Sequence, residues 1–168
     1  MHKKSFMIAL VATAAVTFSV AADARAGVLK ARGANGSAAV AAGQNGAAAR
    51  GARTVQNADG SSTRTSRAGF RGVNGAEGQR GSSTTFGTDG SVSHSANASA
   101  SGARGSASSS GNVSRAADGT LSGGRSTTAT STGTGNSYAG STMIDPATGK
   151  PVHSGTCTNA NGETISCR

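Results

Sequence analysis

The sequence predicts a mainly β protein with much irregular or disordered chain, built from degenerate β-hairpin repeats of about 30 residues. Three observations lead to this fold class: few large apolar residues, a recurring Asp-Gly pair, and an alternation of small apolar and hydroxyl side chains. In residues 27–168, Leu, Ile, Val and Phe together number only 13. Chains with less than about 20% of these residues and high net charge rarely bury enough apolar surface to offset their ordering entropy. We therefore expect small-residue packing and no large hydrophobic core.

The first 26 residues have the features of a cleavable export signal. Two lysines precede an apolar run over residues 6–22, and small residues spaced by one position follow it, so cleavage is expected after Ala24 or Ala26. A membrane-spanning helix needs about 20 strongly apolar residues, and the run is shorter, which makes an uncleaved anchor the weaker alternative. We expect a bacterial protein that is secreted, periplasmic or attached to the cell surface.

Composition divides the rest of the chain into three parts. Residues 27–54 form an Ala/Gly-rich flexible segment, residues 55–134 hold low-complexity Gly/Ser/Thr repeats, and residues 135–168 form a C-terminal hairpin module. Alanine favours helix, but glycine interrupts every alanine run in the first part before three turns can form. At most short, frayed helix is expected there.

The repeats are marked by Asp-Gly pairs. Asp59 and Asp89 are each followed by glycine, and Asp118-Gly119 repeats the pair after a nearly equal interval. Asp-Gly supplies the positive φ angles of tight hairpin turns. A constant period of this kind is typical of one supersecondary unit copied along a chain. Each unit is therefore expected to be a hairpin.

Alternation supports strands between the turns. Over residues 91–101 the odd positions are Ser or Asn, and the even positions are Val92, His94, Ala96, Ala98 and Ala100. A strict period of two predicts a strand with a hydroxyl face and a small apolar face. A similar hydroxyl pattern over residues 126–138 predicts a second such strand. The alternative is a disordered Gly/Ser-rich tether.

The two cysteines lie in the C-terminal part. Asn161-Gly162 marks a hairpin turn that places Cys157 and Cys167 opposite each other. Two cysteines in an exported chain favour a disulfide. A metal site that adds His153 as a third ligand, or free thiols, are the alternatives.

The charge balance is basic. Residues 27–168 carry 13 Lys or Arg and 6 Asp or Glu, a net charge of +7. Five arginines directly precede glycine: Arg32, Arg50, Arg71, Arg80 and Arg104. Such Arg-Gly pairs in a flexible chain can contact anionic polymers, here anionic polysaccharide, lipopolysaccharide or extracellular DNA. The alternative is that scattered arginines only keep a small-residue chain soluble.

No catalytic pattern emerges from the sequence. Gly149-Lys150 resembles the end of a phosphate-binding loop, but Pro151 follows where Ser or Thr is needed. The carboxylates of residues 27–168 occur singly beside glycine-containing turns, so neither a cofactor nor a small-molecule substrate is inferred. The sequence favours a non-enzymatic structural or extracellular-matrix protein that self-associates through its hairpin repeats. The alternatives are a flexible cationic protein that binds polyanions, and a disordered chain whose C-terminal part docks a partner.

Overall fold

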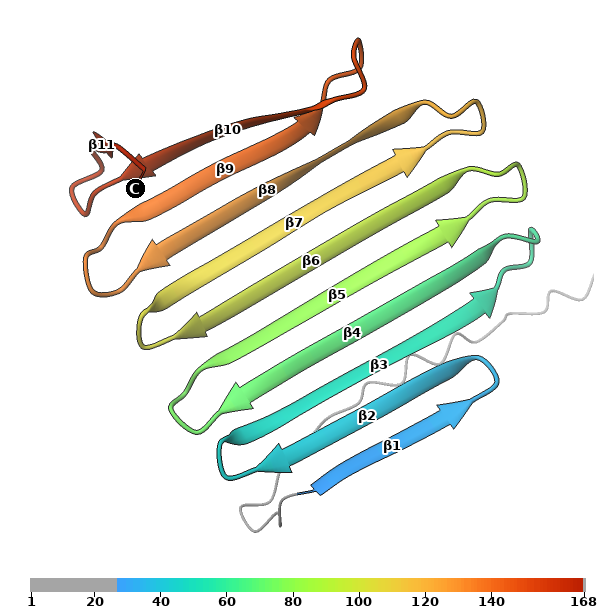
Figure 1. The fold of residues 1–168 in the computed structure, drawn as a ribbon, viewed down its shortest axis with the longest axis horizontal. Coiled ribbons are helices and arrows are strands. Elements are labelled where there is room, and N and C mark those ends of the chain that lie inside the picture. Colours follow the sequence, from blue (N-terminus) through green and yellow to red (C-terminus); the bar gives the residue numbers. More distant parts are fainter. Residues whose placement is uncertain (1–26, 168) are drawn as a thin grey trace, which may run out of the picture.

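The computed structural model describes residues 27–167, which form one antiparallel sheet of eleven strands arranged in sequence order (Figure 1). Every consecutive pair of strands is a hairpin, so the predicted mainly β fold of hairpin repeats is confirmed. The export signal predicted for residues 1–26 lies outside the described residues. The strands are β1 (Gly27–Gly33), β2 (Gly36–Gly43), β3 (Gly46–Gln56), β4 (Ser62–Gly72), β5 (Glu77–Phe86), β6 (Val92–Gly102), β7 (Gly105–Arg115), β8 (Leu121–Ser131), β9 (Ser137–Ile144), β10 (Pro151–Thr158) and β11 (Thr164–Ile165).

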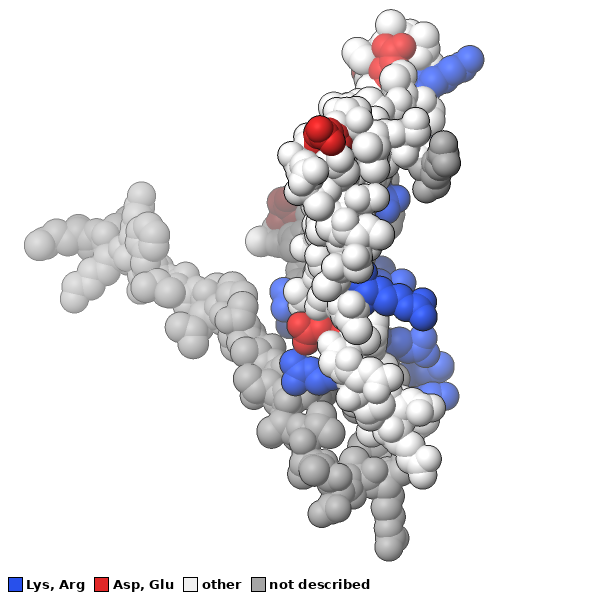
Figure 2. Space-filling model, turned by 90° about the vertical axis from the view of Figure 1, so that its left-hand side faces the viewer, with Lys and Arg blue, Asp and Glu red and all other residues white. Residues whose placement is uncertain are grey.

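The sheet is a single layer. Seen edge-on, the described residues form a thin slab (Figure 2). No hydrophobic residue of this part of the chain is buried, and its one buried polar side chain is Ser61. The larger apolar side chains stay in contact with solvent, including Leu29 at 77% exposure and Phe70 at 50%. The expectation of no large hydrophobic core is therefore confirmed.

Three turns at one end of the sheet share one geometry. Each contains an Asp-Gly pair, and the aspartate carboxylate accepts a hydrogen bond of 2.9 Å from the backbone N–H two residues later. The glycines have φ angles of 84°, 83° and 91° at Gly60, Gly90 and Gly119. Glycine adopts this left-handed conformation without a Cβ penalty. The predicted repeat therefore corresponds to one pair of strands between successive Asp-Gly turns.

The alanine-rich segment, for which a flexible chain with at most short, frayed helix was expected, forms strands. Residues 27–56 contribute β1, β2 and β3. Most of the glycines that interrupt the alanine runs lie at strand ends, where Gly36, Gly43 and Gly46 border the turns, and Gly51 lies inside β3. Pairing with a neighbouring strand then satisfies backbone N–H and C=O groups that a short helix would leave unpaired.

The alternation predicted strand β6 correctly and extended β8 too far. The even and odd residues of β6 lie on opposite sides of the sheet, as expected. Strand β8, however, ends at Ser131, and the next residues turn toward β9. Gly135, with a φ of 68°, donates its N–H to the Ser131 carbonyl at 2.9 Å and closes this turn. Thr132 and Thr134 therefore lie outside the strand.

The cysteines form the predicted disulfide. Cys157 and Cys167 are bonded, with their Cα atoms 5.4 Å apart. The register differs from the expected one by two residues, because Cys157 lies opposite Ile165. The turn is centred on Asn161 instead of Gly162, since the Asn159 N–H donates to the Glu163 carbonyl at 2.9 Å. Both sulfur atoms are thus committed to the disulfide, which excludes the metal site and the free thiols.

Candidate functional site

The sheet has two chemically different faces. Side chains that lie opposite each other on neighbouring strands share a face, and successive residues of a strand alternate between faces. The register places seven basic residues on one side, which we call the cationic face: Lys30, Arg32, Arg50, Arg64, Arg80, Arg115 and Arg125. All seven are exposed. Figure 2 shows most Lys and Arg side chains on one side of the slab.

Acidic residues avoid the cationic face throughout the described strands. We call the opposite side of the sheet the hydroxyl face, because Ser and Thr are its main residues on β6, β7 and β8. Glu77 lies on this face and pairs with Arg71 at 3.2 Å. The remaining carboxylates of residues 27–167 belong to turns: Asp59, Asp89, Asp118, Asp145 and Glu163. The cationic face therefore carries an uncompensated positive charge.

Three of the cations form a row across the strands. Lys30 on β1, Arg50 on β3 and Arg80 on β5 are linked through Ala39 on β2 and Ala68 on β4, each residue lying opposite the next. We call Lys30, Arg50 and Arg80 the cationic row. Neighbouring strands are about 4.8 Å apart, so cations on alternate strands recur about every 9.6 Å. The small alanines between them leave the line open to solvent.

An apolar row runs beside the cationic row and lies two residues away from it on each of the strands β1 to β5. It crosses all eleven strands, and each of its members lies opposite the next. Its members are Val28, Ala41, Ala48, Phe70, Gly78, Ala100, Ala107, Ala129, Tyr138, Cys157 and Ile165. Two residues of a strand span about 6.7 Å, which is the separation between the two rows.

Aromatic rings cover glycines within the apolar row and beside it. A Cβ atom added to Gly78 would lie 2.5 Å from a ring carbon of Phe70, its cross-strand partner. Tyr138 likewise covers Gly155, where a Cβ atom would lie 2.8 Å from the ring. The Tyr138 hydroxyl is 3.1 Å from Nε2 of His153. Because glycine has no Cβ atom, each ring can approach the backbone of the neighbouring strand closely.

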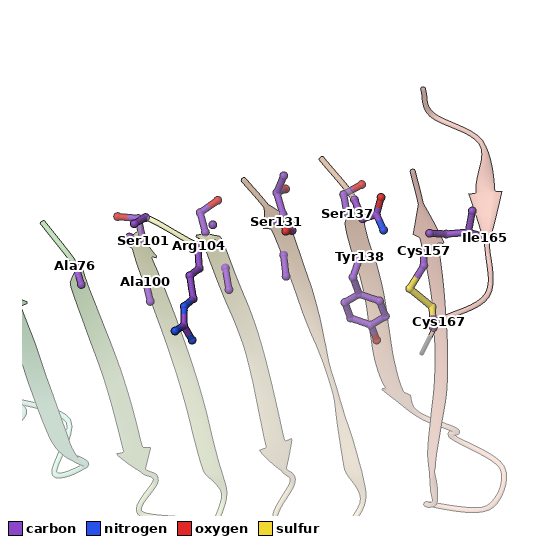
Figure 3. Close-up of a pocket in the computed structure, with 18 of the residues that line it drawn as sticks. Ala76, Ala100, Ser101, Arg104, Ser131, Ser137, Tyr138, Cys157, Ile165 and Cys167 are labelled. Atoms are coloured by element: carbon purple, nitrogen blue, oxygen red, sulfur yellow. A yellow bond between two sulfur atoms is a disulfide. The ribbon is translucent and has the colours of Figure 1, made fainter. Parts of the chain in front are cut away.

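Two shallow hollows lie along these rows. The first, of about 510 Å³, is lined by Val28, Phe70 and all three cations of the cationic row. The second, of about 1130 Å³, is bordered by Tyr138 and the disulfide. In Figure 3 the Arg104 side chain extends from the β6–β7 turn into this second hollow. Each hollow therefore combines an aromatic ring with at least one guanidinium group.

The hydroxyl face is uncharged over β6, β7 and β8. Its residues there are Ser, Thr, Asn and Gly. Cross-strand hydroxyl groups bond directly, as between Ser108 and Thr128 at 2.8 Å and between Ser114 and Ser122 at 2.8 Å. Such pairs satisfy the hydroxyls within the sheet. This region is a flat surface of small polar side chains.

The structure separates the five arginines that the Arg-Gly pairs singled out. Arg32, Arg50 and Arg80 lie on the cationic face, and Arg104 reaches the second hollow from a turn. Arg71 lies on the other face beside Glu77. Four arginines of the candidate site are thus brought to one side of the sheet, and one is not.

Sequence reasoning missed the other members of the cationic face. Lys30, Arg64, Arg115 and Arg125 do not precede glycine. The signal that finds them is parity: once an Asp-Gly turn fixes the register of a hairpin, odd or even spacing from the turn assigns each residue to a face. Whether an arginine directly precedes a glycine does not determine the face on which it lies.

Comparison with known proteins finds no matching family model, no similar curated protein and no similar solved structure. None of the described residues is in a helix long and apolar enough to cross a membrane. The disulfide is compatible with an oxidising compartment such as the periplasm or the extracellular space.

Proposed function

We propose that this chain is an exported, non-enzymatic structural protein that self-associates through its β-sheet. The observation that carries the proposal is the single-layer sheet, which buries no hydrophobic residue in the described part of the chain and leaves strands unpaired at its two edges. A sheet normally covers at least one face with a second layer. An unpaired strand is a template for pairing with another chain. Pairing of edge strands between copies supplies the missing strand partner and leaves the faces of the sheet in solvent.

The strand directions favour edge-to-edge pairing. At one edge, β1 pairs with β2 and with no other strand among residues 27–167, so its outer side has no partner in this part of the chain. At the other edge, β11 pairs with Cys157 and Thr158 of β10, so residues 151–156 pair with β9 on one side and with no described strand on the other. Because neighbouring strands alternate in direction, β1 and β10 run in opposite senses. The β1 strand of one copy therefore meets the β10 strand of the next as an antiparallel neighbour, and the sheet continues.

Edge pairing has fewer obstacles than stacking of cationic faces. Two cationic faces in contact would bring seven positive charges of each copy together without a carboxylate between them. Such like-charge contact is unfavourable. Edge pairing instead joins backbone groups and keeps both cationic faces in solvent.

Sedimentation velocity of the purified chain tests self-association. Assemblies that grow with protein concentration and persist at high ionic strength support the proposal, because backbone pairing is not screened by salt. A monomer at all concentrations would refute it.

Polyanion binding is a second function that one specific observation favours. The cationic face carries seven exposed basic residues, with no carboxylate among its described strand residues. An uncompensated charge of this kind attracts anionic polymers, and the attraction weakens as ionic strength rises. Binding that is unaffected by salt would argue against this second function.

A further inference from the structure

The cationic row has the geometry of a linear polymer rather than of a compact anion. Lys30, Arg50 and Arg80 lie in one line across the strands, with intervals of about 9.6 Å. An extended chain of sugars that carry carboxylates presents them on one side once per disaccharide, which is a repeat of similar length. We propose that the cationic row and the apolar row beside it bind a linear acidic polysaccharide that runs across the strands. This inference rests on the second function above.

The apolar row supplies the second contact that a sugar chain needs. A pyranose ring has an apolar face of C–H groups, which packs on aromatic and small apolar side chains. Phe70 is 50% exposed, and its ring lies over Gly78 of β5, with Ala48 of β3 opposite it on the other side. The two rows are about 6.7 Å apart, so one sugar ring can rest on the apolar row while its carboxylate reaches a cation.

The second hollow continues this path toward the other edge of the sheet. It holds Arg104 as a further cation and Tyr138 as a further ring (Figure 3). The strands β1 to β10 span nine intervals of about 4.8 Å, or about 43 Å in total. A polymer several sugars long therefore fits across one copy.

Charge density favours a polysaccharide over duplex DNA. Duplex DNA carries one charge per about 1.7 Å of its axis, so its neutralisation requires cations at closer intervals than one per about 9.6 Å. The spacing of the cationic row corresponds instead to a polymer with one carboxylate in each disaccharide.

Hyaluronan, which carries one carboxylate per disaccharide, is a suitable probe. Its affinity for the purified chain is measured at low ionic strength, below the protein concentration at which sedimentation detects assembly. The test variant replaces Lys30, Arg50 and Arg80 with Gln. The matched control replaces Arg53, Arg67 and Arg71 with Gln, which removes the same charge from the hydroxyl face. Circular dichroism verifies that both variants keep the sheet.

Relative to the parent chain, we expect the affinity for hyaluronan to fall by roughly tenfold or more in the test variant and by less than about threefold in the control. Exposed ion pairs contribute modestly one by one, but their contributions add along a row. Uncharged dextran is expected not to bind. Equal losses in both variants would overturn the cationic row as the site while polyanion binding stands. Tighter binding of duplex DNA than of hyaluronan would overturn the polysaccharide as ligand. Failure of both polymers to bind would overturn the inference together with the second function.

Discussion

Single glycines decide where the strands can pack closely. Gly105 begins β7 with a φ of 147°, and a Cβ atom there would collide with the Thr130 carbonyl. Gly133 lies in the β8–β9 turn, where a Cβ atom would have no neighbour within 4 Å. The two positions therefore form a matched pair for testing the sheet geometry.

Gly105→Ala is expected to destabilise the sheet by about 1–3 kcal/mol, because it combines backbone strain with a steric clash. Gly133→Ala is expected to change the free energy of unfolding by no more than about 0.5 kcal/mol. Urea unfolding followed by circular dichroism measures both. Equal effects of the two substitutions would show that β7 does not approach β8 as described.

The aspartates of the turns make stability depend on pH. Hydrogen bonds from Ser61 and from Ser91 lower the pKa values of Asp59 and Asp89. The pKa of Asp118 is lowered by hydrogen bonds from Thr120. A carboxyl group whose pKa is lower in the folded state stabilises the fold above its unfolded pKa and loses that contribution as pH falls through its folded pKa.

We therefore expect the thermal midpoint to be constant near neutral pH and to fall below about pH 4, where unfolded aspartates begin to take up protons. Asp89→Asn retains the side-chain oxygen and removes the titration, so its midpoint is expected to fall less steeply with acid than that of the parent chain. Thermal unfolding from pH 2 to pH 7 provides the comparison. A midpoint that rises on acidification would contradict the role of these carboxylates.

At the scale of the hairpin, local sequence rules predicted the turns and the alternation. Asp-Gly pairs placed three turns because an aspartate acceptor and a glycine with positive φ are both local requirements. The strand nature of residues 27–56 was missed because alanine has no local preference for strands, and only pairing with β4 and its neighbours stabilises them there. The cationic face was missed for a related reason, since Lys30 and Arg80 are far apart in sequence and are aligned only by the register of four hairpins.

The shortest strand depends on the disulfide. β11 pairs with β10 through two residues, Thr164 and Ile165. The Cys157–Cys167 bond closes a loop with a sequence separation of 10, for which the chain-entropy model gives about 3 kcal/mol. The cross-link therefore keeps β11 close to β10, to which only two of its residues pair.

Reduction of the disulfide is expected to release β11 and to leave the strands from β1 to β9 intact. Amide hydrogen exchange measures this directly: protection at Ile165 is expected to fall, while protection at Tyr138 on β9 stays unchanged. The double variant with serine at both cysteines should behave as the reduced chain does. Loss of protection across the whole sheet would contradict the local role of the disulfide.

At the scale of the molecule, the proposed assembly depends on the exposed edges. In an edge strand, the backbone groups of one residue point to the paired neighbour and those of the next residue point outward. Leu29 and Lys30 are adjacent in β1, so one of their N–H groups faces β2 and the other faces the open edge. Proline at the outward position removes only the donor that edge pairing needs.

Of the two variants Leu29→Pro and Lys30→Pro, one is therefore expected to block assembly and keep the thermal midpoint of the parent. The other is expected to lower the thermal midpoint, because it removes a hydrogen bond between β1 and β2. Sedimentation velocity and thermal unfolding of each variant separate the two effects. Two variants that both assemble like the parent would rule out β1 as the pairing edge.

X-ray diffraction from aligned assemblies tests continuation of the sheet from copy to copy most directly. Each copy adds the ten strands from β1 to β10 to one sheet, so edge-to-edge assembly is expected to give a strand reflection at about 4.8 Å and a longer repeat of about 48 Å, both along the assembly axis. A single layer also predicts no strong reflection at about 10 Å, the spacing of stacked sheets. A dominant sheet-stacking reflection without the longer repeat would show that the chains associate through their faces, which contradicts edge-to-edge assembly.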